Sequence, residues 1–280
     1  RPHTDEIVIV RALLLQSWYG LSDEELEYQC KDRLSFRAFL GFPEKVPDFS
    51  TIWYARERLK EAKVDVQIWA ELQRQLDLKG YRVEKGVIQD ATFIEAEPGR
   101  ARRAREKKAE KEGKPVEYTP KQLAHIDKDA TYALKGTEIH FGYKLHTKPD
   151  VMYGLIRSCE TTTASTHDGQ IDLVLPGDVA AYRDKGYFGK PISDGVKDET
   201  MLRGVRGRKL NGGEQRRNKR ISRIRSPGER PYAVIKTVFH SGVTFVTTLP
   251  RVDIKNLFTC FAFNLYQLVT LARKSLAKAL

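Results

Sequence analysis

The sequence predicts a mixed α/β fold, in which a sheet flanked by helices follows a small all-helical domain. Apolar residues recur at helical spacing through the first 78 residues. A β-branched apolar run over Val87–Ile94 then has the composition of a central strand. Beyond it, strand-like segments are followed by helical ones, and acidic residues stand near strand ends, which is typical of a mixed sheet with helices on its faces.

The N-terminal domain is expected to span residues 1–79 and to consist of helices. Gly20 closes a first helix that begins near Asp5. Ser22 followed by Glu25 resembles a capping box, and Asp48 offers an N-cap further along. The helices that follow these signals are expected from Leu26, over 51–59 and over 64–78.

The second domain is expected to span residues 80–280 and to begin with a strand that carries Asp90. This aspartate stands at the end of the apolar run Gly86–Gln89. A buried carboxylate without a partner is costly, so Asp90 requires a metal ion or a cationic side chain beside it.

A hydrophilic insertion is expected at about residues 98–135. Its most polar part, residues 98–121, has nine basic and four acidic residues and a net charge of about +5. Such a stretch buries little apolar surface, which predicts a mobile loop or a solvated helix. Its charge fits either a solubilising role or contact with DNA phosphates.

The rest of the second domain is expected to alternate strands and helices. Asp184 would follow a short strand directly. The last 28 residues place apolar side chains on one face of a long helix, which favours core packing. The expected elements are strands 138–147 and 152–161 with a turn at 148–150, a helix over 164–175, a strand over 179–182 and a helix over 253–280.

Three acids have contexts that suit a metal site: Asp90, Asp184 and Glu229. Asp184 precedes a glycine-bracketed loop, and Glu229 is one of two acids among twelve basic residues in the segment 203–236. Three carboxylates can hold two divalent ions for phosphodiester displacement. Mg²⁺ suits such a site because it prefers hard oxygen ligands and keeps several waters; two Mg²⁺ ions are expected, with Mn²⁺ able to substitute.

The net charge of +12 favours a nucleic-acid partner. No apolar run is long enough to cross a bilayer, so we expect no membrane partner and an intracellular protein. Cys30, Cys159 and Cys260 lack the spacing of zinc or disulfide frameworks. The candidate DNA contacts in the basic segment are Arg216, Arg217, Lys219, Arg220, Arg223 and Arg225.

In its motifs and their order, the chain resembles bacterial DDE transposases of the insertion-sequence-five family, within the insertion-sequence-four group. The last family signature is tyrosine, two residues, arginine, three residues, glutamate, six residues and lysine. It aligns here with Ser222, Arg225, Glu229 and Lys236, so that serine replaces the tyrosine. The other segments that carry the resemblance are Ile88–Ala96, Asp127–Ala130, His140–His146, Thr162–Asp168 and Asp184–Tyr187.

The resemblance implies a ribonuclease-H-like sheet with Asp90 on the first strand, Asp184 after the fourth and Glu229 on a helix. It implies that Arg225 and Lys236 hold DNA phosphates, with help from Lys185. Lys144 and His146 are weaker candidates, and Asp168 is expected to cap a helix. The helical domain would bind element ends, form dimers or do both. The implied setting is the bacterial or archaeal cytoplasm, at the nucleoid.

Three functions remain open from the sequence. The first is a transposase that acts as a homodimer or larger assembly on double-stranded DNA, cutting terminal inverted repeats and joining them to target DNA. The second is a nuclease of the same fold without strand transfer. The third is a domesticated DNA-binding regulator, against which the intact Asp90, Asp184 and Glu229 argue.

Overall fold

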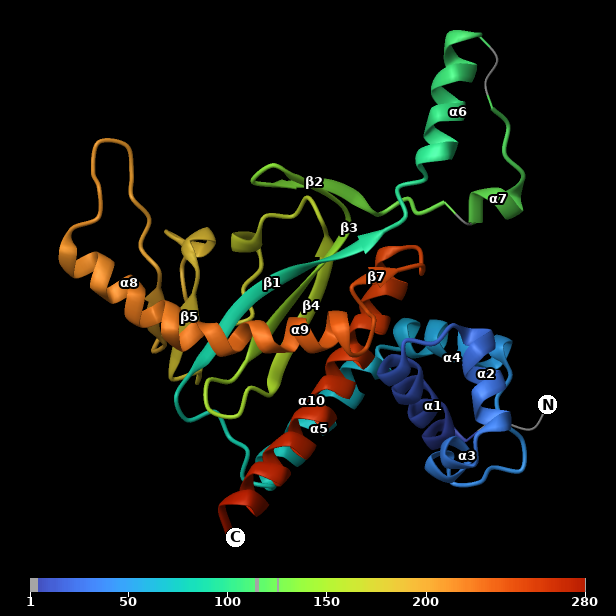
Figure 1. The fold of residues 1–280 in the computed structure, drawn as a ribbon, viewed down its shortest axis with the longest axis horizontal. Coiled ribbons are helices and arrows are strands. Elements are labelled where there is room, and N and C mark those ends of the chain that lie inside the picture. The colour runs from blue at the N-terminus through green and yellow to red at the C-terminus, as the bar shows by residue number, and fades with distance from the viewer. Residues whose placement is uncertain (1–4, 114–115, 125, 280) are drawn as a thin grey trace.

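The N-terminal part of the protein is a cluster of five helices. The computed structural model describes residues 5–113, 116–124 and 126–279, and Figure 1 shows the cluster beside the sheet. Local capping explains where several of these helices begin and end. The side chains of Asp5, Ser22 and Asp48 each accept a hydrogen bond from a first-turn amide, and Gly20 ends the first helix in a left-handed conformation. The helices are α1 (Glu6–Tyr19), α2 (Asp23–Asp32), α3 (Leu34–Leu40), α4 (Phe49–Glu61) and α5 (Val64–Leu78).

The rest of the chain is built on a curled mixed sheet with β1 (Val87–Ala96) at its centre. β1 pairs antiparallel with β3 and parallel with β5, and β5 pairs in parallel with β6 on its other side. Strand β3 pairs with β2 along its first half and with β4 along its second half. The other strands are β2 (Thr131–Lys135), β3 (Glu138–Pro149), β4 (Ile156–Thr163), β5 (Ala180–Arg183), β6 (Lys197–Thr200) and β7 (Val243–Thr244).

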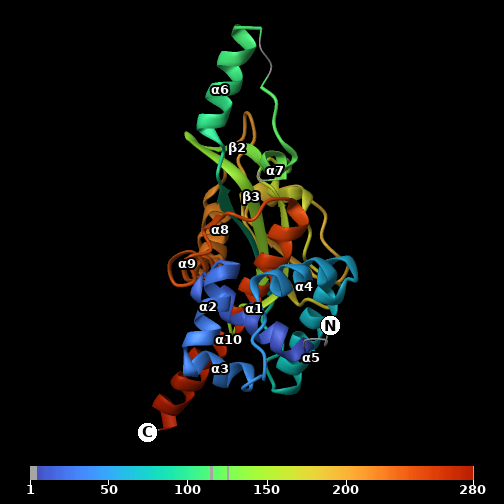
Figure 2. The same ribbon diagram turned by 90° about the vertical axis from the view of Figure 1, so that its right-hand side faces the viewer.

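The predicted fold class is confirmed: a mixed α/β sheet is flanked by helices and preceded by a helical region, as in ribonuclease-H-like folds. Gly86 lets β1 approach β5, since it has a φ of 97° and a Cβ there would lie 2.4 Å from the Ala180 carbonyl oxygen. Two helical segments cross the sheet in front of β1, as Figures 1 and 2 show: α8 (Gly212–Arg225) and α9 (Arg230–Thr237).

The long C-terminal helix α10 (Leu249–Ala279) joins the two parts of the fold. Its Phe258 is buried with the side chains of α1 to α4, whereas its Phe263 is buried against β3 and β4. The core stripe expected on this helix is therefore present. Because α10 packs on both parts, a division of the chain at residue 79 stays a prediction.

The hydrophilic insertion contains α6 (Arg100–Lys111) and α7 (Pro120–Ala124), and α6 projects away from the sheet (Figure 2). Arg103 anchors its base, because its guanidinium lies 4.9 Å from the ring centres of Tyr132 and Phe141 and donates to the Tyr132 hydroxyl. The charged residues beyond it, such as Arg105 and Lys107, are exposed. Lys114, one of the nine basic residues counted between residues 98 and 121, lies outside the described residues.

Three sequence expectations about local structure are wrong. Residues 164–175 form no α-helix; they hold only the 3₁₀ turn η1 (Asp168–Gln170), because Thr163, Ser165 and Thr166 engage one another and β2 through side-chain hydrogen bonds. His167, rather than Asp168, caps that turn. Strand β3 also continues through Lys148 to Pro149, so the turn to β4 comes later than expected.

Candidate active site

Asp90 and Asp184 lie at the point where strands β1 and β5 separate. The last paired residues of these parallel strands are Gln89 and Arg183. The residue that follows each of them is an aspartate: Asp90 continues β1, where it pairs with Thr147 of β3, and Asp184 directly follows the end of β5. Asp184 thus stands at the carboxyl end of β5, the kind of position where open α/β sheets place their ligand sites, and Asp90 lies beside it within β1.

Burial dominates the environment of Asp90. Its side chain is 24% exposed, and the nearest cation is Arg225, whose Nη2 lies 3.4 Å from Oδ2. Burial raises the pKa of Asp90 to about 6; Arg225 and the Ala91 amide oppose the rise, while the charges of Asp184 and Asp168 add to it. The site thus holds more negative charge than Arg225 compensates, which favours a bound cation.

Asp184 is oriented by the backbone that follows it. It caps the 3₁₀ turn η2 (Lys185–Tyr187), and its Oδ1 accepts a hydrogen bond of 2.7 Å from the Gly186 amide. The preceding Arg183 is 1% exposed and donates to Thr200 Oγ1 at 2.8 Å, which ties β5 to β6. A rigid strand end therefore positions Asp184.

Glu229 stands on a segment that packs against β1, but its side chain does not join the other two acids. It ends the 3₁₀ segment η3 (Ser226–Glu229) between α8 and α9, and its side chain is exposed. Its neighbour Gly228 packs so closely on β1 that a Cβ there would lie 2.8 Å from Ile88 Cγ2. Within the described ranges, no three His, Cys, Asp or Glu side chains converge closely enough to hold a metal ion.

The donor set at the sheet edge fits a divalent cation in part. Asp90 within β1 and Asp184 directly after β5 offer hard oxygen ligands at neighbouring positions. Burial raises the pKa of Asp90, and the charge of Asp184 adds to the rise. The described conformation supplies two carboxylates rather than three, so Mg²⁺ would need Glu229, waters or substrate oxygens to complete its coordination.

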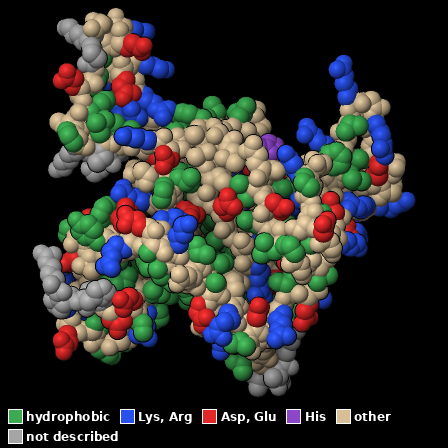
Figure 3. Space-filling view, turned by 180° about the vertical axis from the view of Figure 1, so that it is seen from behind, with side chains coloured by type: hydrophobic (Ala, Val, Ile, Leu, Met, Phe, Trp, Pro, Cys, Tyr) green, Lys and Arg blue, Asp and Glu red, His purple; other side chains and the backbone are tan. Residues whose placement is uncertain are grey.

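Apart from Arg225, which pairs with Asp90, the basic residues of α8 divide into those with and those without an acidic partner on β6. Figure 3 shows Lys and Arg side chains over the projecting part of the molecule that contains α8. Arg216, Lys219 and Arg223 are exposed along this helix. Arg217 and Arg220 instead hold Glu199 of β6, with N···O distances of 3.3 and 2.7 Å.

The remaining candidate cations differ in position. Lys185 is exposed in η2, directly after Asp184, and Lys236 is exposed on α9. The side chain of Lys144 is 11% exposed and pairs with Asp168 at 2.8 Å. From the sequence, Lys144 is a weaker candidate and Asp168 is expected only to cap a helix, although both fall in the motifs that carry the family resemblance.

His146 is a buried residue of the sheet. Its Nε2 lies 2.9 Å from Thr162 Oγ1, and burial lowers its pKa to about 4. It therefore stays neutral near pH 7 and has the environment of a packed structural histidine.

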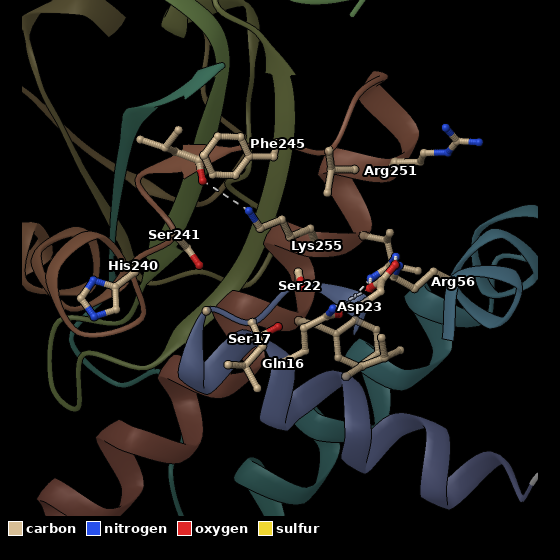
Figure 4. A pocket seen from close by; sticks show the side chains of 17 residues that line it. Gln16, Ser17, Ser22, Asp23, Arg56, His240, Ser241, Phe245, Arg251 and Lys255 are labelled. Carbon is tan, nitrogen blue, oxygen red and sulfur yellow. Dashed lines mark hydrogen bonds and ion pairs between the residues drawn. The ribbon is translucent and has the colours of Figure 1, made fainter. Parts of the chain in front are cut away.

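A cavity of about 360 Å³ lies apart from these carboxylates, between the helical region and α10. Lys255 lines the cavity and donates to the Val243 carbonyl at 3.3 Å. Arg56, another lining residue, lies beside Asp23 (Figure 4). Burial lowers the pKa of Lys255 to about 8, and the Arg56 charge adds to the effect. None of Asp90, Asp184 and Glu229 lines this cavity.

Comparison with protein families identifies the chain. A family model described as "Transposase DDE domain" matches residues 81–265, about two thirds of the 280 residues. The chain belongs to this DDE transposase family. A second model, "Transposase domain (DUF772)", matches residues 1–58, which lie in the helical region. No solved structure gives a significant match.

Family membership defines the general activity. The protein is a transposase, an enzyme that processes nucleic acid, and its partner is DNA. DDE transposases generally use divalent metal ions. Across the described part of the chain, no helix combines the length and apolar character needed to span a bilayer.

Proposed function

We propose that the protein is a transposase of the insertion-sequence-five family, within the insertion-sequence-four group. It cuts the ends of its element by metal-dependent phosphodiester hydrolysis and joins the freed 3′-hydroxyls to target DNA. The observation that carries the proposal is the placement of Asp90 on β1 and of Asp184 directly after the neighbouring parallel strand β5, with Arg225 beside Asp90.

Asp90, Asp184 and Glu229 are the proposed metal ligands. Divalent ions bound there would activate a water or a 3′-hydroxyl and stabilise the leaving oxygen. Asp90 and Asp184 provide the fixed part of the site. Glu229, whose carboxylate is exposed in the free protein, completes it when its side chain turns toward the other two acids from its place at the end of η3.

Arg225 has two roles in this proposal. In the free protein it neutralises part of the charge at Asp90. In the DNA complex it binds a phosphate beside the cleaved bond, for which its planar guanidinium is well suited. Lys185 lies next to Asp184 and contacts the same strand, and Lys236 contacts DNA further along α9.

The charge distribution favours different partners for the two parts of the chain. Residues 1–79 contain 12 Lys and Arg and 14 Asp and Glu, a net charge of −2. The whole chain has a net charge of +12, so the remaining residues have a net charge of +14. We infer that residues 80–280 hold most of the DNA contacts, and that the helical domain contributes mainly to a homodimer or larger assembly at the nucleoid of a bacterial or archaeal cytoplasm.

The experiment that tests the function measures cutting and joining together. The purified protein and its Glu229→Gln variant are incubated with Mg²⁺ or Mn²⁺, labelled DNA from the flanks of the gene, and a target plasmid. The proposal predicts joined product from the parent protein and none from the variant, with DNA binding nearly unchanged. Cutting without joining would support a nuclease, and binding without either reaction would support a regulator.

A further inference from the structure

Asp168 approaches the candidate active site because two tight turns pack together. It is the first residue of η1, which lies against η2, the turn that Asp184 caps. Gly169 permits this contact: a Cβ there would lie 2.9 Å from Lys190 Cε and 3.1 Å from the Gly186 carbonyl oxygen. The packing brings a third carboxylate toward Asp90 and Asp184.

Lys144 fixes Asp168 in this position. The Lys144 ammonium donates to the Thr166 carbonyl at 2.7 Å and to Asp168 Oδ1 at 2.8 Å, and it lies 5.1 Å from the centre of the Phe93 ring. Lys144 thereby connects strand β3 both to Thr166, which precedes η1, and to Asp168, its first residue. The Asp168 side chain remains 35% exposed, so an oxygen is accessible to a bound water.

Tyr187 provides a second and independent observation at the same place. The residue is 1% exposed, and its hydroxyl has no hydrogen-bond partner among the described protein atoms. Burial raises the pKa of Tyr187, and the charges of Asp168, Asp90 and Asp184 add to the rise. A buried hydroxyl without a partner is costly. Tyr187 thus lies in the turn that Asp184 caps and that η1 contacts, and the hydrogen-bonding capacity of its hydroxyl is unused.

The three aspartates do not approach closely enough to share a metal ion directly, since no such group of side chains exists among the described residues. Mg²⁺ keeps several of its waters when it binds a protein. Those waters are strong hydrogen-bond donors, and carboxylate and phenol oxygens accept such bonds. Residues that bind the waters of a metal position it without touching it.

We propose that Asp168, held by Lys144, accepts a hydrogen bond from a water on the divalent cation that Asp90 and Asp184 bind, and that the Tyr187 oxygen accepts another. This inference rests on the proposed metal site. It makes Asp168, Lys144 and Tyr187 positioning residues and assigns them no chemical step.

The test is a Mn²⁺ titration of the full chain without DNA, followed by electron paramagnetic resonance. Asp168→Asn keeps an acceptor for Lys144 but loses the charge, and should weaken Mn²⁺ binding about 10-fold. Tyr187→Phe removes one oxygen and should weaken binding by a smaller factor. The matched control is Asp172→Asn, an exposed aspartate in the same loop, which should bind as the parent does.

The outcomes separate this inference from the proposal on which it rests. If Asp90→Asn loses Mn²⁺ binding while Asp168→Asn and Tyr187→Phe bind like the parent, Asp168 and Tyr187 have no positioning role. If Asp90→Asn also binds like the parent, the metal site itself is misassigned. If Asp168→Asn strongly lowers the melting temperature of the metal-free protein, its Mn²⁺ affinity no longer tests the inference, and Tyr187→Phe is used instead. A Tyr187→Phe protein that binds Mn²⁺ as tightly as the parent would then overturn the inference.

Discussion

Arg225, the last residue of α8, places its Nη2 atom 3.4 Å from Oδ2 of Asp90 on the central strand. The contact links the basic helix to the most buried carboxylate of the candidate active site. It also leaves the Arg225 Nε atom buried without a partner among the described residues. A guanidinium held in this way is stabilised by one carboxylate and still has donors for another anion.

The pair should show energetic coupling in metal-free buffer. Arg225→Gln leaves Asp90 without its cation and is expected to lower the free energy of unfolding at pH 7.5 by about 1 kcal/mol. In an Asp90→Asn background the same substitution should cost close to nothing. Urea unfolding of the four proteins gives the coupling; a value of zero would mean that the contact carries no energy.

Asp90 should destabilise the metal-free fold at neutral pH. Its pKa is raised to about 6 from an ordinary 3.8, so the folded chain binds this proton more tightly than the unfolded chain. The penalty is therefore absent below about pH 4, grows as the pH rises, and is complete above about pH 6.

Asp90→Asn is thus expected to raise the free energy of unfolding by about 3 kcal/mol at pH 7.5 and to have little effect near pH 4. Urea unfolding with a chelator present measures both values. A stabilisation that did not change between these pH values would show that the charge of Asp90 is not its cause. Mn²⁺ affinity should fall below about pH 6 for the same reason, because the protonated carboxyl is a poor ligand.

The two groups of cations on α8 should respond differently to substitution. Neutralising Arg216, Lys219 and Arg223 together should weaken DNA binding and reduce the slope of log K against log salt by about 3, with no change in melting temperature. An unchanged slope would mean that these side chains do not contact phosphates.

Glu199 allows the second group of α8 cations, Arg217 and Arg220, to be tested. It is 2% exposed and holds Arg217, Arg220 and Lys197. Glu199→Ala should cost about 1–3 kcal/mol of folding free energy, because it releases the contact between α8 and β6. Differential scanning calorimetry checks the loss, and a melting temperature equal to that of the parent would contradict this structural role.

Gly228 should be required for activity because it sets the distance between η3 and β1. A methyl group there would lie 2.8 Å from Cγ2 of the buried Ile88, so η3 and Glu229 must shift. Gly228→Ala is expected to reduce cleavage at least 10-fold at a stability cost of about 1–3 kcal/mol. The control is Gly212→Ala, where a Cβ meets open space. Equal cleavage by both variants would argue against a precise position for η3.

Lys255 should be a destabilising cation in its cavity. Burial lowers its pKa to about 8 from an ordinary 10.5, so the penalty is complete below about pH 8 and disappears above about pH 10.5. Lys255→Met is expected to raise the free energy of unfolding by about 3 kcal/mol at pH 7 and to have no effect near pH 10.5. Lys274→Met, an exposed change on the same helix, is the control. A destabilised Lys255→Met protein at pH 7 would indicate that the ammonium has a stabilising partner.

The sequence predicted correctly those helix ends that are fixed by interactions between neighbouring residues. Asp48 and Gly20 fix helix ends through their own side chain or backbone, and both act as expected. Asp90 and Asp184 were found because each stands next to a short apolar run that forms a strand. Their proximity, however, depends on the parallel pairing of β1 and β5, which the family resemblance implied and no local signal encodes.

Tertiary packing decided the features that the sequence did not predict. Residues 164–175 have helical composition, but Gly169 must fit against η2, and Asp168 binds Lys144 instead of capping a helix. Arg217 and Arg220 look like their exposed neighbours in the sequence, and only the position of β6 shows that Glu199 holds them. The exposure of Glu229 likewise follows from the path of η3.

The most direct test of the proposed active site is a crystal structure of the protein with its element end and Mn²⁺, read by anomalous scattering. The account predicts an anomalous peak between Asp90 and Asp184, with a Glu229 oxygen brought to a distance typical of a metal ligand, about 2.1 Å. A peak bound by other residues, or one at Asp90 and Asp184 with Glu229 still exposed to solvent, would contradict the proposed three-carboxylate site.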